Sequence, residues 1–367
     1  MRVWVLALLV VAGCGRSGGQ AEQAENRPLH GSAEAIARHL GPVPHDSLLT
    51  VSESFGKYFE AVGALELSGE YLIRHLSRLD VGPDGRMLVQ DRRSSEVILF
   101  AADGGLIAKL DPAACHPGHS GRLGSSGFFP DGSVLATASG DAHMIFDAAG
   151  QCVGPWDGPR YAHHTTVGPD GLIYQYFPIT NNIQLEARDR DGQLVHAWPV
   201  HREFPLLSER LRAGDLVVDT SGTAYMTLSI DGHPRVYRPG SEESILGQPP
   251  ASFMAPTEDL PEVSGMEAVI EAMQSRRPSS GSVYLWKLDA DRLMLGYVHP
   301  EPIGPGDDER AEFRVINMEG EPVHAEPIFY RFYLSGFVGA ADGVLYRMLH
   351  PTGDDDNPTL VLYRFTG

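Results

Sequence analysis

The sequence predicts an all-β fold, a six-bladed β-propeller of four-stranded antiparallel blades. Three observations lead to this prediction. A short Asp-Gly turn recurs along the chain, a run of β-branched, aromatic or large apolar residues follows each copy, and a second apolar run ends in another polar turn. A tight turn followed by such a run is a strand signal. Residues 75–367 divide into six of these units of about 49 residues, within the range of propeller blades.

Two turns set the order of elements in each unit. In unit one they are Gly82-Pro83-Asp84-Gly85 and Ala102-Asp103-Gly104. The other first turns are 130–132, 168–171, 219–222, the degenerate 289–292, and 340–343. The other second turns are 147–150, 189–192, 239–240, 317–320 and 366–367. In each unit we therefore expect four strands. A turn joins the first strand to the second, a loop joins the second to the third, and another turn joins the third to the fourth. A two-layer sandwich or two unrelated β domains are the alternatives, but neither needs the same turn six times.

The last unit lacks its fourth strand, because the sequence stops at Gly367 after the third. In a closed ring the N-terminal part of the chain can supply the missing outer strand. Residues 58–67 (YFEAVGALEL) are apolar enough for that position. We therefore expect a ring closed by an N-terminal strand.

The pattern resembles six-bladed propellers of the NHL-repeat type. Its closest copy is 79–110, with the Gly-Pro-Asp-Gly turn, an apolar strand, a polar residue and a second strand that ends in an Asp-Gly turn. The resemblance covers about residues 60–367 and implies the propeller fold. It does not specify a function, because that fold carries scaffolds, peptide binders, lactonases and lyases.

Residues 1–13 have the features of an export signal. Arg2 is followed by nine apolar residues, 3–11, which are too few to span a bilayer. The next residues, Val11-Ala12-Gly13-Cys14, resemble the lipobox of bacterial lipoproteins. That resemblance implies acylation of Cys14 and a lipid anchor in the cell envelope, and Gly15 favours the outer membrane, facing the periplasm or the exterior. The alternative is a buried strand with an incidental cysteine, although the polar, Gly-rich stretch that follows is typical of a tether.

Three segments follow from these patterns: a lipid anchor and flexible tether over 14–57, the propeller over 58–367, and a helical insertion at about 250–279. In the insertion, Ser264-x-x-Glu267 predicts a capping box. Met266, Val269, Ile270 and Met273 then form one apolar helical face. The helix either packs on the edge of a blade or forms a lid or docking surface over the channel.

The repeat gives the ring two different rims. We call the edge with the turns, such as 82–85 and 102–104, the turn rim. The opposite edge, with the loops between second and third strands and the connections between blades, is the loop rim. Loops on a rigid scaffold often carry function, so a protein, peptide or small-molecule ligand is expected there. The candidate ligand-binding residues are Arg92, His143, Arg160, Tyr161, His163, His164, His233, His299 and His350.

His163 and His164 begin an innermost strand, which places them near the mouth of the central channel. Several neutral histidines that converge there could bind a metal. The alternative is that these histidines are scattered polar residues of the loops. No cofactor is predicted, and Ca²⁺ or Zn²⁺ is the alternative to that prediction.

The two cysteines that follow Cys14 allow two interpretations. An exported protein can keep a disulfide between Cys115 and Cys152. The strand map, however, places Cys115 near the loop rim and Cys152 near the turn rim, whereas a disulfide needs Cα atoms within about 7 Å. Both the bonded and the unbonded state remain open at this point.

The chain carries 29 Lys and Arg against 48 Asp and Glu, a formal net charge of −19. Nucleic acid binding needs a basic surface, so this balance argues against it. Local spacing assembles no nucleophile and base, so no catalytic residue is assigned. The preferred interpretation is a monomeric, lipid-anchored, non-catalytic binding or scaffolding module. The alternative is a metal-dependent propeller enzyme, a lactonase-like hydrolase or a lyase, with its site at the channel mouth.

Overall fold

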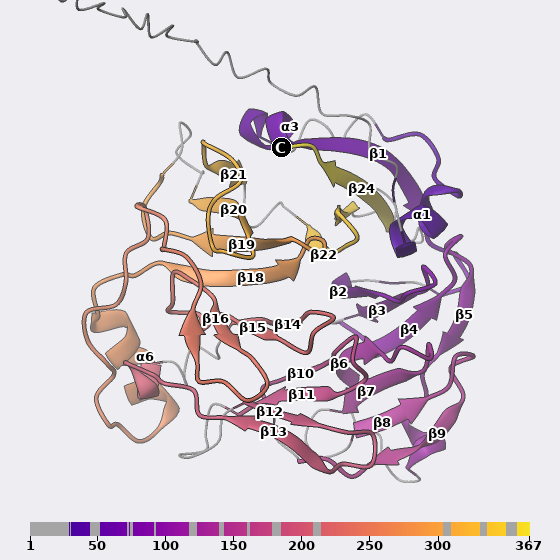
Figure 1. The fold of residues 1–367 in the computed structure, drawn as a ribbon, viewed down its shortest axis with the longest axis horizontal. Coiled ribbons are helices and arrows are strands. Elements are labelled where there is room, and N and C mark those ends of the chain that lie inside the picture. Colours follow the sequence, from indigo (N-terminus) through magenta and orange to yellow (C-terminus); the bar gives the residue numbers. More distant parts are fainter. Residues whose placement is uncertain are drawn as a thin grey trace, which may run out of the picture.

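The computed structural model describes most of the chain from Leu29 to the C-terminus. The described residues are 29, 31–44, 52–71, 73, 76–91, 93–116, 123–138, 143–159, 162–177, 185–207, 214–303, 310–330, 336–349 and 358–367. Within them, six four-stranded antiparallel sheets form a ring (Figure 1). The predicted six-bladed β-propeller is therefore confirmed.

Each of the first five blades follows the chain from its innermost to its outermost strand. Blade one is β2 (Leu76–Val81), β3 (Met87–Asp91), β4 (Glu96–Phe100) and β5 (Leu106–Lys109). Blade two is β6 (Leu123–Phe128), β7 (Val134–Ala138), β8 (His143–Phe146) and β9 (Cys152–Trp156). Blade three is β10 (His164–Val167), β11 (Ile173–Tyr176), β12 (Leu185–Arg188) and β13 (Leu194–Trp198).

The other three blades repeat this order with one exception. Blade four is β14 (Leu216–Val218), β15 (Ala224–Met226), β16 (Arg235–Tyr237) and β17 (Ser244–Ile245). Blade five is β18 (Gly281–Lys287), β19 (Arg292–Val298), β20 (Ala311–Asn317) and β21 (Ile328–Tyr330). Blade six is β22 (Phe337–Ala341), β23 (Val344–Leu349), β24 (Thr359–Phe365) and, from the other end of the chain, β1 (Phe59–Glu66).

The N-terminal strand closes the ring as predicted. β1 pairs antiparallel with β24, from Phe59 opposite Phe365 to Glu66 opposite Thr359. Each innermost strand also contacts the innermost strands of both neighbouring blades, including β2 with β22. The last blade is thus completed by the first strand, and it meets blade one without a gap in the ring.

The chemistry of the turn rim explains the repeated Asp-Gly signal. In unit one the Asp84 carboxylate accepts a hydrogen bond from the Arg86 amide, 3.1 Å away. Gly85 lies between them with φ of +83°, in the left-handed region that glycine enters without a steric penalty. The same bond forms at Asp131 and Asp170, each followed by a glycine with positive φ. In blade four, Asp219 starts the turn and accepts from the Ser221 amide, and Gly222 has the positive φ.

Burial falls from the middle of each blade to its outer edge. The second strands, such as β11 and β15, are buried along their whole length. The outermost strands, such as β5 and β13, keep most side chains partly or fully exposed. Apolar residues on both faces of the inner strands therefore pack between neighbouring blades, which is the core that holds the ring.

Part of the segment expected to be a flexible tether is folded. Helix α1 (Gly31–Ala37) buries Ala33 and Ile36 completely. The Ser32 amide donates to the Asp342 carboxylate at 2.8 Å. Helix α3 (Glu53–Tyr58) inserts Phe55 into the core between blades five and six. Residues 1–28, including Cys14 and the signal, lie outside the described residues.

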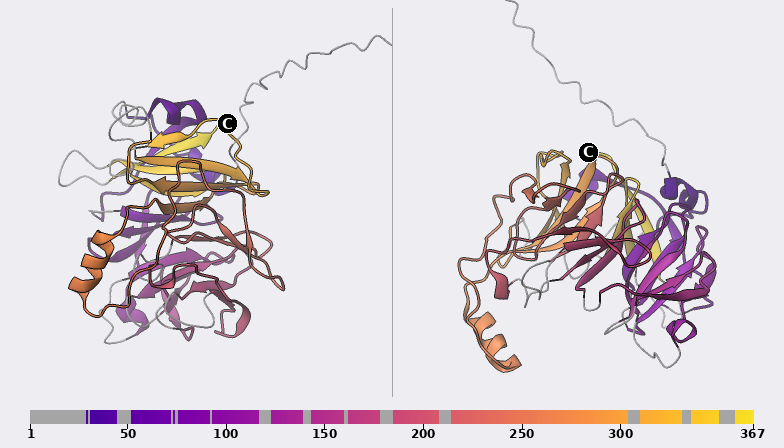
Figure 2. Two further views of the ribbon diagram at one scale, coloured as in Figure 1. Left: turned by 90° about the vertical axis from the view of Figure 1, so that its left-hand side faces the viewer. Right: turned by 60° about the horizontal axis from the view of Figure 1, so that its bottom comes forward.

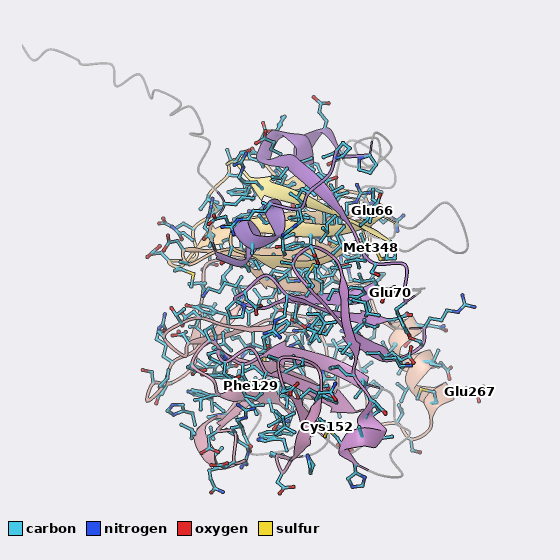
Figure 3. All side chains as sticks on the ribbon, turned by 90° about the vertical axis from the view of Figure 1, so that its right-hand side faces the viewer. Glu66, Glu70, Phe129, Cys152, Glu267 and Met348 are labelled. Atoms are coloured by element: carbon cyan, nitrogen blue, oxygen red, sulfur yellow. A yellow bond between two sulfur atoms is a disulfide. The ribbon has the colours of Figure 1, made fainter. Side chains whose placement is uncertain are left out.

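The insertion forms a helix, α6 (Met266–Ser275), but its predicted capping box is wrong. The N-cap is Gly265, and no side chain caps the helix. Met266 is 72% exposed and Ile270 47%, whereas Val269 is buried. The expected apolar face of the helix is therefore only partly buried. Helix α6 projects from the body of the protein (Figure 2), and Figure 3 labels Glu267 on the same helix. No helix among the described residues has the length and apolarity to cross a membrane.

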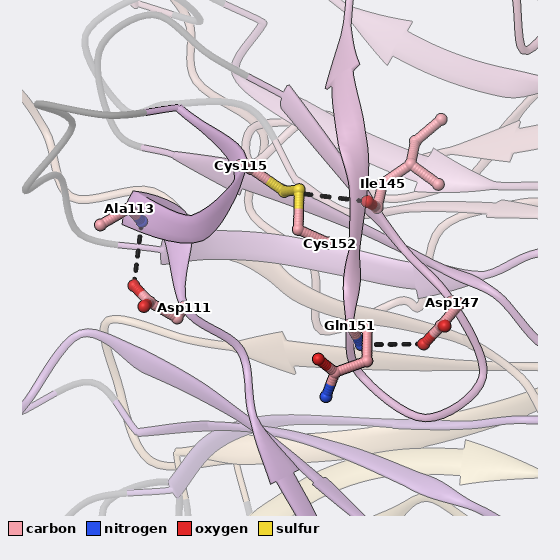
Figure 4. The surroundings of a disulfide bond; sticks show 7 residues. All are labelled: Asp111, Ala113, Cys115, Ile145, Asp147, Gln151 and Cys152. Atoms are coloured by element: carbon pink, nitrogen blue, oxygen red, sulfur yellow. Dashed lines mark hydrogen bonds between the residues drawn. A yellow bond between two sulfur atoms is a disulfide. The ribbon is translucent and has the colours of Figure 1, made fainter.

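The structure joins Cys115 and Cys152 in a disulfide, with Cα atoms 5.3 Å apart (Figure 4). The strand map that separated them missed helix α4 (Pro112–Cys115). The N-cap of this helix is Asp111, whose carboxylate accepts from the Ala113 amide at 2.9 Å. It turns the chain back onto β9 after blade one, so Cys115 meets the start of that strand.

Candidate functional site

Five of the nine predicted binding residues are described: His143, His163, His164, His233 and His299. The other four, Arg92, Arg160, Tyr161 and His350, lie outside the described residues. The five histidines do not converge on one site. Of the five, His164 contacts charged groups from two other blades. It begins the innermost strand β10, which is the position in the blade that the sequence predicts.

The channel-mouth cluster consists of Arg78, Asp80, His164 and Asp215. Arg78 and Asp80 lie on β2 of blade one, His164 begins β10 of blade three, and Asp215 directly precedes β14 of blade four. Arg78 Nε lies 3.1 Å from Asp80 Oδ2, and Arg78 Nη1 lies 3.4 Å from His164 Nε2. His164 Nε2 is in turn 3.6 Å from Asp215 Oδ1. Three blades thus meet through side chains at this end of the channel.

The cluster is enclosed but still reaches solvent. The side chains of Arg78, Asp80 and Asp215 are 25%, 21% and 22% exposed, and that of His164 is 10% exposed. Burial, reinforced by the Arg78 guanidinium and His163, holds the pKa of His164 well below its usual range. Burial raises the pKa of Asp215, although Arg78 opposes the change.

Acidification is expected to destabilise the protein, and His164→Gln is expected to reduce that loss. An unfolded histidine gains a proton as the pH falls through about 6.5, whereas the folded cluster keeps His164 neutral well below that value. The unfolded state therefore binds more protons, and this residue should cost up to about 2 kcal/mol of stability between pH 7 and pH 5. Urea unfolding at both pH values measures the loss.

The control for that experiment is His201→Gln, which removes an exposed histidine. Asp215 opposes the acid effect, because its raised pKa lets the folded state take up a proton, but it does so equally in wild type and variant. Buried His143 and His324 and half-buried His233, whose pKa values burial also lowers, likewise remain in both proteins. If His164→Gln and wild type lose the same stability, His164 is not held neutral.

The cluster combines hydrogen-bonding groups with two candidate metal ligands. Among the described residues, no three His, Cys, Asp or Glu side chains lie together so that they could hold one. His164 and Asp215 could supply two ligands, but the Arg78 guanidinium beside His164 would repel a divalent cation. Carboxylate acceptors, guanidinium donors and a neutral imidazole at one place can hydrogen-bond a polar ligand.

His299 belongs to a separate network inside blade five. Its Nδ1 lies 2.9 Å from the Ser280 hydroxyl, and its Nε2 lies 3.6 Å from Glu312 Oε1. The Met254 amide donates to the Ser280 oxygen, which leaves the Ser280 hydroxyl proton for His299 Nδ1. Ser252 donates to Glu312 at 2.7 Å. The side chains of His299 and Glu312 are only 1% exposed, so this network is closed to ligands and instead ties the insertion to blade five.

Among the remaining predicted histidines, the His143 side chain has contacts inside the protein. His143 Nε2 lies 2.9 Å from the Pro159 carbonyl and 3.1 Å from the Gln175 side-chain nitrogen, in a buried network between blades two and three. The His163 amide donates to the Tyr176 carbonyl at 2.8 Å. Burial lowers the pKa of His233. His143 and His299 therefore lie in two separate networks, and both residues are buried.

Sequence reasoning missed three of the four cluster residues. Arg78 and Asp80 are charged residues in an innermost strand, Leu-Ser-Arg-Leu-Asp-Val, in which Leu76 and Leu79 are buried. Charges in a strand that should be enclosed are a signal that was available. Asp215 had no such signal, because a single acidic residue before a three-residue strand looks like part of a loop.

No protein-family model and no curated protein matches the chain. Solved structures do match the chain, and at the low identities given below they resemble it in fold alone. A Bacteroides fragilis protein described as exported aligns with a TM-score of 0.58 and 12% identity, over 86% of this chain and 97% of its own.

Two further structures resemble the chain. A member of the DUF4221 family from Bacteroides vulgatus aligns with a TM-score of 0.58 and 11% identity, over 84% of this chain and 98% of its own. Virginiamycin B lyase from Staphylococcus aureus aligns with a TM-score of 0.49 and 11% identity, over 83% of this chain and 99% of its own. The two alignments with a TM-score of 0.58 show a shared fold, and at 11–12% identity they do not imply a shared activity.

Proposed function

We propose that this protein is a lipid-anchored propeller of the cell envelope, of the NHL-repeat type, which binds a polar ligand over the channel mouth without catalysing a reaction. The observation that carries the proposal is the channel-mouth cluster. Arg78, His164 and Asp215 come from three different blades and meet within 3.6 Å, at the end of the channel where the long loops lie. The anchor is acylated Cys14, and the outer membrane is its proposed location.

Two features support binding at this end of the channel rather than at the other. The turn rim is built from short Asp-Gly turns whose carboxylates are already used by backbone amides. The loop rim carries the long connecting segments, among them the one over 246–280 between β17 and β18. Long loops on a rigid scaffold, around a polar and partly exposed cluster, are a common form of ligand site.

Photocrosslinking in intact cells tests the proposal. A photoreactive amino acid at exposed Ser94 lies on the loop rim of blade one, and Thr220 offers an exposed position on the turn rim as the control. We expect an adduct from Ser94 and none from Thr220, and we expect Asp215→Asn to abolish the adduct while the melting temperature is kept. Equal adducts from both rims, or an adduct that Asp215→Asn leaves unchanged, would contradict the proposal.

A metal-dependent hydrolase or lyase is the second candidate, because it requires His164 to meet a carboxylate from another blade. His164 and Asp215 fulfil that requirement. The protein purified without added metal or chelator should then hold about one equivalent of Ca²⁺ or Zn²⁺, lost in His164→Gln, and should cleave ester or lactone substrates. Repulsion by Arg78 is the reason that binding without a metal is preferred.

A further inference from the structure

We propose that the anchored protein turns its turn rim toward the membrane and presents its loop rim, with the channel-mouth cluster, to the aqueous side. The inference rests on the proposed acylation of Cys14. It deepens the proposed function, because it states from which side a ligand must approach: a partner embedded in the anchoring membrane could not reach the cluster, whereas a partner in the aqueous compartment could.

The first folded residues fix the point where the chain joins the propeller. The Ser32 amide and hydroxyl both donate to Asp342, which lies in the turn between β22 and β23 of blade six. A Cβ added to Gly85, in the corresponding turn of blade one, would lie 3.2 Å from the Ser32 carbonyl and 2.8 Å from Ala35. Helix α1 therefore starts between two inner turns, on the turn rim.

Packing holds this starting point in place. Ala33 and Ile36 are completely buried in the apolar cluster between blades six and one, and Leu29 packs against the same cluster. Gly41 then pairs with Ala64 of β1 on both of its backbone groups. A chain that arrives at Leu29 therefore cannot swing to the loop rim without breaking these contacts.

The reach of the preceding segment sets the orientation. Sixteen residues separate Cys14 from Gly31. A flexible chain of that length, as its Gly-rich, polar composition predicts, has an average end-to-end distance of roughly 22 Å. A folded domain of this size is about 50 Å across. To lay the loop rim on the membrane, the tether would have to pass around the domain at close to its full extension of about 55 Å.

The turn rim is acidic, so it is not expected to bind an anionic membrane directly. Exposed carboxylates occupy its turns, including Asp84, Asp103, Asp170 and Asp191. An anionic lipid surface would repel them over about a Debye length, near 8 Å at physiological salt. The acyl chains on Cys14 are therefore the attachment, and the acidic rim sets a short separation between membrane and ring.

Energy transfer to the membrane tests the orientation. Pro83→Cys and Ser94→Cys place single free thiols at exposed positions on the turn rim and the loop rim of the same blade, since the native pair is bonded. Each full-length lipidated variant is labelled with a donor dye and reconstituted in phosphatidylcholine vesicles that contain an acceptor-labelled headgroup. We expect more transfer from Pro83→Cys than from Ser94→Cys, with unchanged melting temperatures.

Equal transfer from the two positions, or more transfer from Ser94→Cys, would overturn the orientation while leaving the anchor intact. The anchor itself is tested separately by mass spectrometry of the N-terminal peptide and by vesicle flotation of wild type and Cys14→Ser. Absence of acylation in wild type, or flotation that Cys14→Ser does not abolish, would overturn the proposed anchor and the orientation with it. Flotation lost in Cys14→Ser together with higher transfer from Pro83→Cys supports both.

Discussion

A chain that begins at residue 68 should fail to form a stable propeller, whereas one that begins at residue 29 should fold. The truncation removes β1, the outer strand of blade six, together with Phe55, Phe59, Leu65 and Leu67, which are at most 4% exposed. Burying each of these side chains contributes about 1.5–3 kcal/mol, so the loss is on the order of 10 kcal/mol. That equals the total stability of an ordinary domain, about 5–15 kcal/mol.

The loss has a second cause besides lost burial. Without β1, the edge of β24 is unpaired and blade six is left incomplete, and an exposed edge of that kind invites aggregation. Thermal melting by circular dichroism and gel filtration of the two chains provide the measurement. If the chain from residue 68 melts at the same temperature and stays monomeric, β1 does not hold the ring closed.

A point variant keeps the test informative if the truncated chain cannot be recovered. Phe55 stacks on Phe59 and contacts Phe337 and Tyr363, so Phe55→Ala should cost about 3–5 kcal/mol. Lys57→Ala lies two residues away in the same helix and removes only an exposed ion pair with Glu326, so it serves as the matched control. Its cost should be close to zero.

Loss of the Cys115–Cys152 disulfide is the second large expected effect. The bond closes a loop over a sequence separation of 37, and the chain-entropy estimate for such a loop is about 4 kcal/mol. The double variant Cys115→Ser with Cys152→Ser should therefore unfold at a clearly lower urea concentration. The reason lies mainly in the unfolded chain, which gains conformations when the link is absent.

Reduced wild type provides the control for the double variant. If the effect comes from the link itself, wild type under reducing conditions should lose as much stability as the double variant does without reductant. A double variant as stable as oxidised wild type would mean that the contact of α4 with β9 holds this loop without the bond. A variant less stable than reduced wild type would show that the serines themselves disturb the packing.

The sequence by itself determined the architecture, because each blade is specified by local chemistry. An Asp and a Gly at fixed places make the turn, as at Asp84 and Gly85, and the apolar runs on either side can only be strands. Repetition of that unit also predicted that residues 58–67 supply an outer strand that closes the ring, and the structure shows this strand over 59–66. Each of these signals depends on residues that are close together in the sequence. They can therefore be recognised without knowing how distant parts of the chain pack.

Features that depend on one irregular turn could not be predicted in this way. The disulfide was judged from a strand map, and the four-residue helix α4 that brings Cys115 to β9 left no periodic signal. The insertion helix was found from its period, but its cap was placed one residue early, at Ser264 rather than Gly265.

Only the tertiary structure decided which polar residues meet. His164 was placed near the channel from its position at the start of an inner strand, but its partners come from blades one and four, 86 and 51 positions away in the chain. Nothing in the sequence distinguishes His299 and His143 from His164. In the structure, His299 lies in a closed network of blade five and His143 in one between blades two and three. Closure of the ring brings distant inner strands to one axis, and this long-range geometry is absent from any local pattern.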